Sequence, residues 1–260
     1  MMIQPAGNRL QVRAVDTDGF IVPLPPRRIP APWRQAVLYA VQSYLDRLGH
    51  RLHSVYVRGS IAAGNPVDRK SDLDTIAVIR GKVSAADDTW CRRQTVKDHG
   101  FPFCTRIEYK IYGLRTALYL REPKILIKVH SICVHGTDLR RRIPGFKADK
   151  NVALFAPRIG MDLARYRSYS TGGSNSWDIW IIKRILRCGL ELSIERTGLY
   201  SVDLTTCFRV FALNYPQQRS QMHKVLRALF APSSSKLHQT VSRLVEQVGP
   251  WLERETKNQF

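Results

Sequence analysis

A pair of aspartates at the start of an apolar strand constrains this chain more than any other feature. Asp72 and Asp74 stand two residues apart, and the strand predicted over 73–79 is otherwise apolar or β-branched. Alternate residues of a strand point to the same face of a sheet, so both carboxylates face the same way. Like charges held this close repel each other, and a hard divalent cation with oxygen ligands neutralises them. The sequence therefore predicts a Mg²⁺ site at the start of this strand.

A glycine and a serine precede this pair, at the end of the preceding predicted strand. Gly59 lets the backbone approach a phosphate group, and the Ser60 hydroxyl can bind it. A third carboxylate, Glu108, lies in a strand predicted over 104–112, and it reaches the same face if that strand pairs beside the one carrying the aspartates. Three carboxylates facing a Gly-Ser turn are typical of metal-assisted phosphoryl chemistry.

The order of these motifs resembles the polymerase-beta-type nucleotidyltransferase superfamily, in the branch of bacterial antibiotic (aminoglycoside-type) nucleotidyltransferases. The resemblance spans roughly residues 33–255 and includes the segment 134–139, whose Gly-x-Asp-Leu closes the catalytic domain in that branch. It implies an α/β (α+β) fold, with a nucleotidyltransferase domain on a small mixed sheet followed by a C-terminal helical bundle domain. It also implies transfer of a nucleoside monophosphate from a nucleoside triphosphate, ATP or CTP, with two Mg²⁺ ions or, alternatively, Mn²⁺.

The resemblance also implies a role for each site residue. Asp72 and Asp74 would be metal ligands, and Glu108 would be either the third ligand or the base for the acceptor hydroxyl. Gly59 and Ser60 would hold the β- and γ-phosphates.

Two basic residues in the second half extend this set. Lys183 and Arg187 are four residues apart, so they share one face of a predicted helix. The resemblance suggests that this face points at the triphosphate and offsets the charge of the leaving group.

Three regions are predicted along the chain. They are an N-terminal arm over 1–31 with a short strand near 20–24, a catalytic domain over 32–150 and a helical domain over 151–260. In the catalytic domain, the spacing of apolar residues predicts helices over 33–48 and 84–98 and strands over 53–58, 73–79, 104–112 and 125–134. In the helical domain it predicts helices from Ser174 or Ser176 to Thr197, over 214–230 and over 234–255.

The net charge bears on the acceptor. Lys and Arg number 41 against 21 Asp and Glu, which leaves +20, and such an excess favours a polyanionic partner, with nucleic acid ahead of a membrane surface. The same excess repels polycationic aminoglycosides. The favoured acceptor is therefore a hydroxyl on RNA, such as a tRNA 3′ end, as in a toxin or defence enzyme. The candidate nucleic-acid-binding residues are Arg140, Arg141, Arg142, Arg165 and Arg167.

Other readings stay open at this point. The resemblance to the antibiotic branch favours a small antibiotic as acceptor, and protein nucleotidylation or a catalytically idle partner protein are further alternatives. The five cysteines are an odd number without a Cys-x-x-Cys pair, which predicts reduced thiols. The first residues do not form a secretory signal, and no apolar run approaches the roughly 20 residues that span a bilayer. A soluble cytoplasmic protein without a membrane partner is therefore expected.

Overall fold

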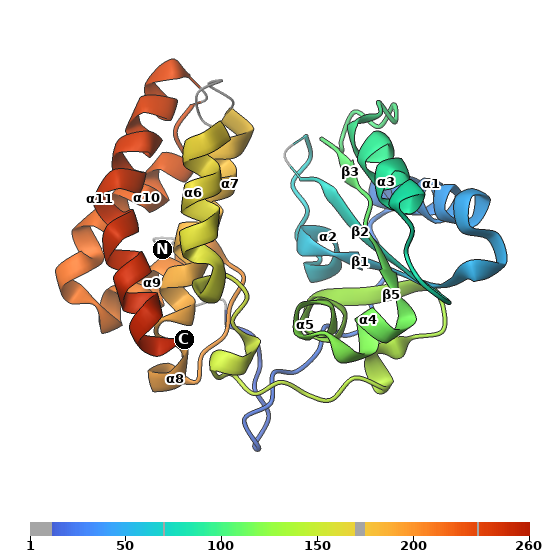
Figure 1. Ribbon diagram of the computed structural model, residues 1–260, viewed down its shortest axis with the longest axis horizontal. Helices are drawn as coiled ribbons and strands as arrows, with labels where there is room; N and C mark the ends of the chain where they lie inside the picture. The colour runs from blue at the N-terminus through green and yellow to red at the C-terminus, as the bar shows by residue number, and fades with distance from the viewer. Residues whose placement is uncertain (1–11, 70, 170–174, 233) are drawn as a thin grey trace, which may run out of the picture. The chain divides into compact units, whose positions relative to one another are not determined.

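The chain is described by a computed structural model that covers residues 12–69, 71–169, 175–232 and 234–260 (Figure 1). It divides into two compact units, which we name the sheet unit and the helical unit. The sheet unit is Val22–Gly145, and the helical unit combines Phe146–Phe260 with the described residues up to Ile21. The first eleven residues of the predicted arm and Ser174 lie outside the described residues. The domain limits at 32–150 and 151–260 stay predictions.

The sheet unit is built on a mixed five-stranded sheet. The strands lie in the order β3-β2-β1-β5, and β4 also pairs with β2. β1 is antiparallel to β2 and β5, whereas β2 is parallel to β3 and β4. Together with the helices that follow, this confirms the predicted fold class. The elements are α1 (Ala31–Leu48), β1 (Leu52–Arg58), α2 (Gly59–Ala63), β2 (Leu73–Ile79), α3 (Ala85–Val96), β3 (Ile107–Glu108), β4 (Ile111–Gly113), α4 (Leu114–Tyr119), α5 (Arg121–His130) and β5 (Ser131–Gly136).

One face of the sheet is covered by α1. The buried side of this helix carries Ala36, Ala40 and Tyr44, and it packs in one apolar cluster with Val55 of β1 and Ala77 of β2. Residues of a strand alternate between faces. The even-numbered residues of β2, and those of β1 from Ser54 onward, therefore lie on the face that α1 leaves uncovered, and this is the face of the two aspartates.

The single strand predicted over 104–112 is wrong, because it is interrupted between β3 and β4. The backbone N–H of Tyr109 donates to Thr95 Oγ1 (3.1 Å), and the backbone N–H of Lys110 donates to the hydroxyl of Tyr44 (3.0 Å). Side chains of α1 and α3 thus take two backbone donors, and regular pairing stops where they do.

The strand predicted over 125–134 is also wrong, because its first part is the helix α5. Glu122 and Pro123 stand in the first turn of α5, and Lys128 and His130 stand in its last turn. Acidic residues and proline favour the start of a helix, and basic residues favour its end. Only the second part of the predicted strand belongs to β5.

The strand predicted near 20–24 is absent from the described residues. Val15 and Ile21, and Phe20 and Lys147, form isolated bridges instead. Proline has no backbone N–H, so Pro23 ends any continuation of a ladder.

The helical unit is a bundle around one apolar core. Its elements are α6 (Ile159–Tyr169), α7 (Asn175–Glu191), α8 (Ile194–Thr197), α9 (Leu204–Asn214), α10 (Arg219–Leu229) and α11 (Ser235–Gln259). Buried side chains from α6, α7, α9, α10 and α11 meet in this core, among them Leu163, Ile182, Phe211, Val225 and Val245. In none of the described ranges does a helix have both the length and the apolar character needed to cross a membrane.

Two predicted helices of this unit differ from the structure. The helix predicted up to Thr197 ends at Glu191, whose buried carboxylate accepts the backbone N–H groups of Leu154, Phe155 and Ala156 (2.8, 2.8 and 2.6 Å). Residues this far apart in the sequence give no local signal for the end of the helix. The residues after Glu191 form a separate short helix, α8.

The helix predicted over 214–230 is shorter, and the helix before it was not predicted. α9 ends at Asn214, and the helical segment of α10 starts only at Arg219, after Pro216. Asp203 begins α9 by accepting the backbone N–H of Thr206 (2.7 Å), which is a typical helix N-cap.

The start of α3 contains a buried ion pair. Ser84 and Asp87 form a reciprocal capping box, and the Asp87 carboxylate lies 2.9 Å from Nη2 of Arg51. Burial acts to raise the pKa of Asp87, but the hydrogen bonds from Arg51 and Ser84 outweigh it and lower the pKa to about 2. The pKa in the unfolded chain is about 3.9, so the carboxylate stabilises the fold when it is ionised.

Replacement of Asp87 with asparagine is expected to lower the free energy of unfolding at neutral pH by about 3 kcal/mol, at about 1.4 kcal/mol per pKa unit. The contribution of a carboxylate with a lowered pKa is present above its unfolded pKa and is lost as pH falls through its folded pKa. The difference between the variant and the parent should therefore shrink below about pH 4. Urea unfolding across pH measures it. Asp88→Asn, at an exposed neighbouring position, is the control, and an equal effect of the two variants would contradict the argument.

Candidate active site

The sheet register brings three charged residues side by side. Arg58 of β1 is opposite Asp74 of β2, and Asp74 is opposite Glu108 of β3. The guanidinium of Arg58 bridges the two acids, with Nη2 lying 2.7 Å from Asp74 Oδ1 and 3.2 Å from Glu108 Oε2. The Asp74 side chain is 13% exposed and that of Glu108 is 34% exposed. The carboxylates of Asp74 and Glu108 therefore both contact the Arg58 guanidinium at the end of β1. The strand that carries Glu108 pairs beside β2, which is the condition that the sequence analysis set for Glu108 to reach the same face.

Arg58 and Glu108 have shifted pKa values because each lies close to an opposite charge. Burial acts to lower the pKa of Arg58, but the negative charges of Asp74 and Glu108 outweigh it, so the pKa is raised. Burial acts to raise the pKa of Glu108, but the positive charge of Arg58 contributes to a net lowering. Both groups are therefore charged at neutral pH.

Asp72 stands just before β2, where its carboxylate faces a second arginine. Its Oδ2 lies 3.4 Å from Nη2 of Arg106, and its side chain is 37% exposed. Across the described ranges of the chain, no three His, Cys, Asp or Glu side chains form a ready-made metal cluster. The donor chemistry nevertheless fits a hard divalent cation, because Asp74 and Glu108 already share a cation between their oxygens.

Gly59 approaches this pair more closely than any other residue type could. Its φ of +73° lies in the left-handed region, and a Cβ added to it would stand 2.5 Å from Oδ2 of Asp74. The following residue ties the turn to the strand, because Ser60 Oγ donates to Ser71 Oγ at 3.1 Å, next to Asp72. The Gly-Ser turn and the acidic pair are thus one structural unit.

The opposite face of the sheet holds β3 in place. Thr75 Oγ1 donates to the backbone carbonyl of Glu108 (2.7 Å), and the Tyr44 hydroxyl lies 2.9 Å from the same Thr75 oxygen. All three hydrogen-bonding groups belong to buried or half-buried residues. They fix the backbone from which the Glu108 carboxylate extends.

The two basic residues predicted to meet the triphosphate lie on α7 of the helical unit. Lys183 is half-buried, and the Arg187 guanidinium lies 5.1 Å from the centroid of the Phe155 ring. The buried Nε of Arg187 has no hydrogen-bond acceptor in the part of the chain that is described. Their contact with the triphosphate stays a prediction.

The three consecutive arginines after β5 are not equivalent. The Arg140 guanidinium pairs with Asp138 (2.8 Å) and donates to the backbone carbonyls of Leu24 (2.8 Å) and Ser131 (3.1 Å), and its side chain is 11% exposed. Arg141 and Arg142 are exposed. Binding of nucleic acid by all three stays a prediction, but only Arg141 and Arg142 present their charge to solvent.

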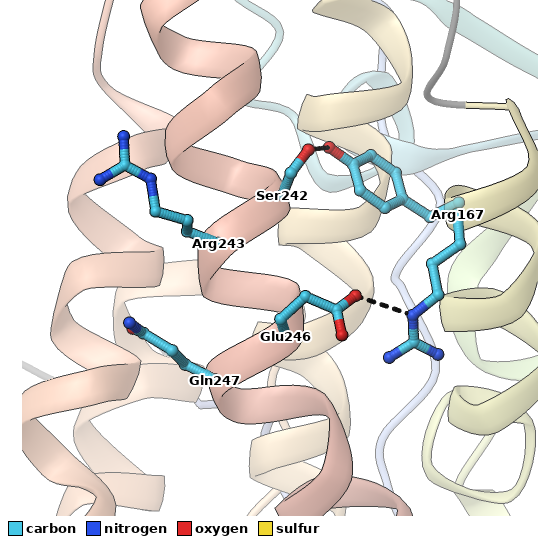
Figure 2. Close-up of a pocket in the computed structure, with 6 residues that line it drawn as sticks. Arg167, Ser242, Arg243, Glu246 and Gln247 are labelled. Carbon is cyan, nitrogen blue, oxygen red and sulfur yellow. Dashed lines mark hydrogen bonds and ion pairs between the residues drawn. The ribbon is translucent and has the colours of Figure 1, made fainter.

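The two arginines of α6 that were predicted to bind nucleic acid, Arg165 and Arg167, also differ in their contacts. Figure 2 shows Arg167 extending toward Glu246 of α11, and its Nε donates to that carboxylate at 2.9 Å. Its Nη1 lies 3.7 Å from Glu253, so two acids balance its charge. Arg165 is exposed and lies over aromatic rings instead. Nucleic-acid binding by either residue stays a prediction.

Arg58 is a candidate site residue that the sequence analysis did not single out. It directly precedes Gly59, and its strand position has the parity of the face that carries Asp74. The sequence did contain a signal for Arg58, because it is an arginine at the last position of a strand that pairs with the strand carrying the aspartates.

A small mixed sheet followed by a helical bundle is the fold class that the motifs predicted. Among solved structures, the chain is similar to the spectinomycin adenyltransferase AAD(9) from Enterococcus faecialis, crystallised with ATP and spectinomycin. The TM-score is 0.53 and the sequence identity is 12%, over 86% of this chain and 99% of that one. No family model and no curated protein matches the sequence.

Proposed function

We propose that this protein is a Mg²⁺-dependent nucleotidyltransferase that moves a nucleoside monophosphate from a nucleoside triphosphate, ATP or CTP, to an acceptor hydroxyl. The observation that carries the proposal is the register that sets Asp74 beside Glu108, directly against the Gly59 turn. The fold that it shares with an adenyltransferase supports the same reaction class.

The reaction exchanges a phosphoanhydride bond for a phosphodiester bond. The acceptor oxygen bonds to the α-phosphorus, the bond from that phosphorus to the bridging β-oxygen breaks, and pyrophosphate leaves with the electron pair. The acceptor proton passes to a base. When bound, two Mg²⁺ ions, or Mn²⁺ in their place, supply positive charge that polarises the phosphate oxygens and stabilises the leaving group.

This chain's residues divide the remaining work. Asp72, Asp74 and Glu108 would hold the metal, or Glu108 would instead take the acceptor proton. Backbone groups at Gly59 and the hydroxyl of Ser60 would hold the β- and γ-phosphates. Lys183 and Arg187 would offset the charge that develops on pyrophosphate.

For the acceptor we propose RNA, such as a tRNA 3′ end, as in a toxin or defence enzyme of the cytoplasm. The net charge of +20 favours a polyanion, and all five cysteines are free thiols, which is typical of a reducing compartment. A second candidate is an antibiotic, and the likeness to the spectinomycin adenyltransferase favours it. Protein nucleotidylation is a third outcome of the test.

The deciding experiment supplies each labelled nucleoside triphosphate with Mg²⁺ and offers three acceptors in parallel. These are total tRNA, a panel containing spectinomycin and aminoglycosides, and a protein extract. Label on tRNA supports the RNA acceptor. Label confined to a small molecule or to protein overturns that acceptor but leaves the reaction class standing, and no transfer to any acceptor contradicts the reaction class.

Binding of tRNA is expected to weaken steeply with salt. Each phosphate neutralised by Lys or Arg contributes about −0.7 to the log–log slope for a single strand, so five or six contacts lose roughly a hundredfold between 50 and 200 mM salt. Replacing the exposed Arg141 and Arg142 with glutamine should flatten this slope by about 1.4. Arg92→Gln with Arg93→Gln on α3 removes the same charge elsewhere in the sheet unit and is the matched control. A shallow slope in the parent would show that the +20 does not serve nucleic acid.

A further inference from the structure

A continuous series of arginine and aromatic side chains lies along α6, α7 and the segment just before α6 in the helical unit. We name it the Arg–aromatic ladder. Its members, in spatial order, are Tyr169, Trp177, Arg165, Trp180, Arg184, Phe155 and Arg187. None of these residues belongs to the acidic pair or to the Gly-Ser turn.

The first part of the ladder centres on Arg165. The rings of Tyr169 and Trp177 stack with centroids 4.9 Å apart and planes inclined by 4°. The Arg165 guanidinium carbon lies 5.2 Å from the Trp177 centroid, 5.8 Å from that of Tyr169 and 5.9 Å from that of Trp180. One guanidinium is thus held by three rings.

The second part continues the alternation. The Arg184 guanidinium carbon lies 5.1 Å from the ring centroids of both Trp180 and Phe155, and that of Arg187 lies 5.1 Å from Phe155. The ladder therefore holds six guanidinium–ring contacts. Six of the nine cation–ring contacts in the described part of the chain thus lie in this ladder. Their concentration in one place calls for a functional explanation.

The ladder is open to solvent in part and carries unbalanced charge. Tyr169 is 55% exposed, Arg165 is exposed, and Trp177 and Trp180 are half-buried. Arg184 pairs with Asp162 (3.5 Å), whereas neither Arg165 nor Arg187 forms an ion pair with another described residue. Trp177, Trp180, Arg184 and Arg187 follow helical spacing, so the ladder extends along one face of α7 for about 15 Å.

We propose that the Arg–aromatic ladder binds unpaired nucleobases of single-stranded RNA. Every base has a flat π-face that stacks on an aromatic ring or on a guanidinium, and the guanidinium N–H groups contact the phosphates between the bases. Duplex RNA hides these faces, because its bases stack on one another. The inference rests on the RNA acceptor of the proposed function and names the surface that holds it.

A test compares two oligonucleotides on the full-length protein without Mg²⁺ or a nucleoside triphosphate. One is a short oligoadenylate, and the other is an abasic oligonucleotide with the same number of phosphates. Affinity is measured by fluorescence anisotropy, and tryptophan fluorescence reports contact with the rings. The parent should bind the oligoadenylate about tenfold or more tightly than the abasic strand, and tryptophan fluorescence should be quenched.

Two variants separate stacking from charge. Tyr169→Leu removes a mostly exposed ring, and it should reduce the preference for the base-bearing strand several-fold while the melting temperature stays close to that of the parent. Trp177→Leu should reduce it further. Arg243→Gln removes one exposed charge on α11 without removing any of the ring contacts of the ladder, and should weaken both strands equally.

Equal affinity of the parent for the two strands would overturn the proposal, as would a preference for duplex RNA or an unchanged preference in both ring variants. Because the test uses no catalysis, it stands apart from the proposed function. A protein that binds oligoadenylate through the ladder but transfers no nucleotide supports this inference while contradicting the proposed reaction.

Discussion

Replacing Asp74 with asparagine is expected to abolish nucleotidyl transfer and to leave the protein folded. Asparagine has almost the same shape but lacks the negative charge that would hold a divalent cation. Removing one such electrostatic group from an active site costs about a hundredfold or more in kcat. Arg58 keeps Glu108 as a partner at 3.2 Å, so no charge is left buried and alone.

The measurement is the initial rate of label transfer at saturating Mg²⁺ and nucleoside triphosphate, with urea unfolding as the check on folding. Asp68→Asn, an exposed position in the loop before β2, is the matched control and should keep the rate of the parent. An Asp74→Asn protein with full transfer in Mg²⁺ would remove Asp74 from the active site and the proposed reaction with it.

Gly59→Ala is the second substitution with a large expected effect. The new Cβ would stand 2.5 Å from Oδ2 of Asp74, so the carboxylate must move. Misplacement of a catalytic group by about 1 Å costs on the order of a hundredfold in rate. The left-handed backbone adds about 1–2 kcal/mol of destabilisation.

Gly81→Ala separates these two effects. Gly81 follows β2 with a φ of +87°, and a Cβ there meets no atom within 4 Å. It shares the backbone strain of Gly59→Ala but not the collision. Both variants should be destabilised by similar amounts in urea, while only Gly59→Ala loses transfer. Equal activities of the two would show that the close approach of Gly59 to Asp74 has no role in the reaction.

The strand with the acidic pair could be predicted because its signals are local. A run of apolar and β-branched residues, entered through Ser71 and Asp72, gives the observed bounds of β2, and alternation alone gives the shared face of the aspartates. The place of Gly59 and Ser60 at the end of β1 follows from the same local pattern, whereas the short helix α2 that they begin was not predicted.

The break between β3 and β4 could not be predicted in this way. Tyr109 and Lys110 fit a strand by their residue types, yet Thr95 and Tyr44 take their backbone donors. These partners lie in other helices, and Tyr44 is more than sixty residues away along the chain. α5 misled for a related reason, since Ile125, Ile127 and Val129 alternate like a buried strand although they are helical.

Arg58 shows the same limit at the site itself. Its position at the end of β1 is local information, but its contact with Glu108 depends on the parallel pairing of β3 with β2. The spacing of residues in the sequence predicts which carboxylates belong to the site. The arginine that balances their charge becomes visible only once the strands are paired in the sheet.

The arginines beside the carboxylates also affect how the protein matures. Asp72, Asp74 and Glu108 share two guanidinium groups, so the cluster keeps a residual charge of only one negative. A structural zinc domain folds only when its ligands receive the metal, because folding and metal binding are one event. Here the counter-charge is part of the polypeptide. Newly synthesised chains therefore need no divalent ion to offset these carboxylates while they fold, and under the proposed function the supply of the ion would govern the rate of transfer rather than the amount of folded protein.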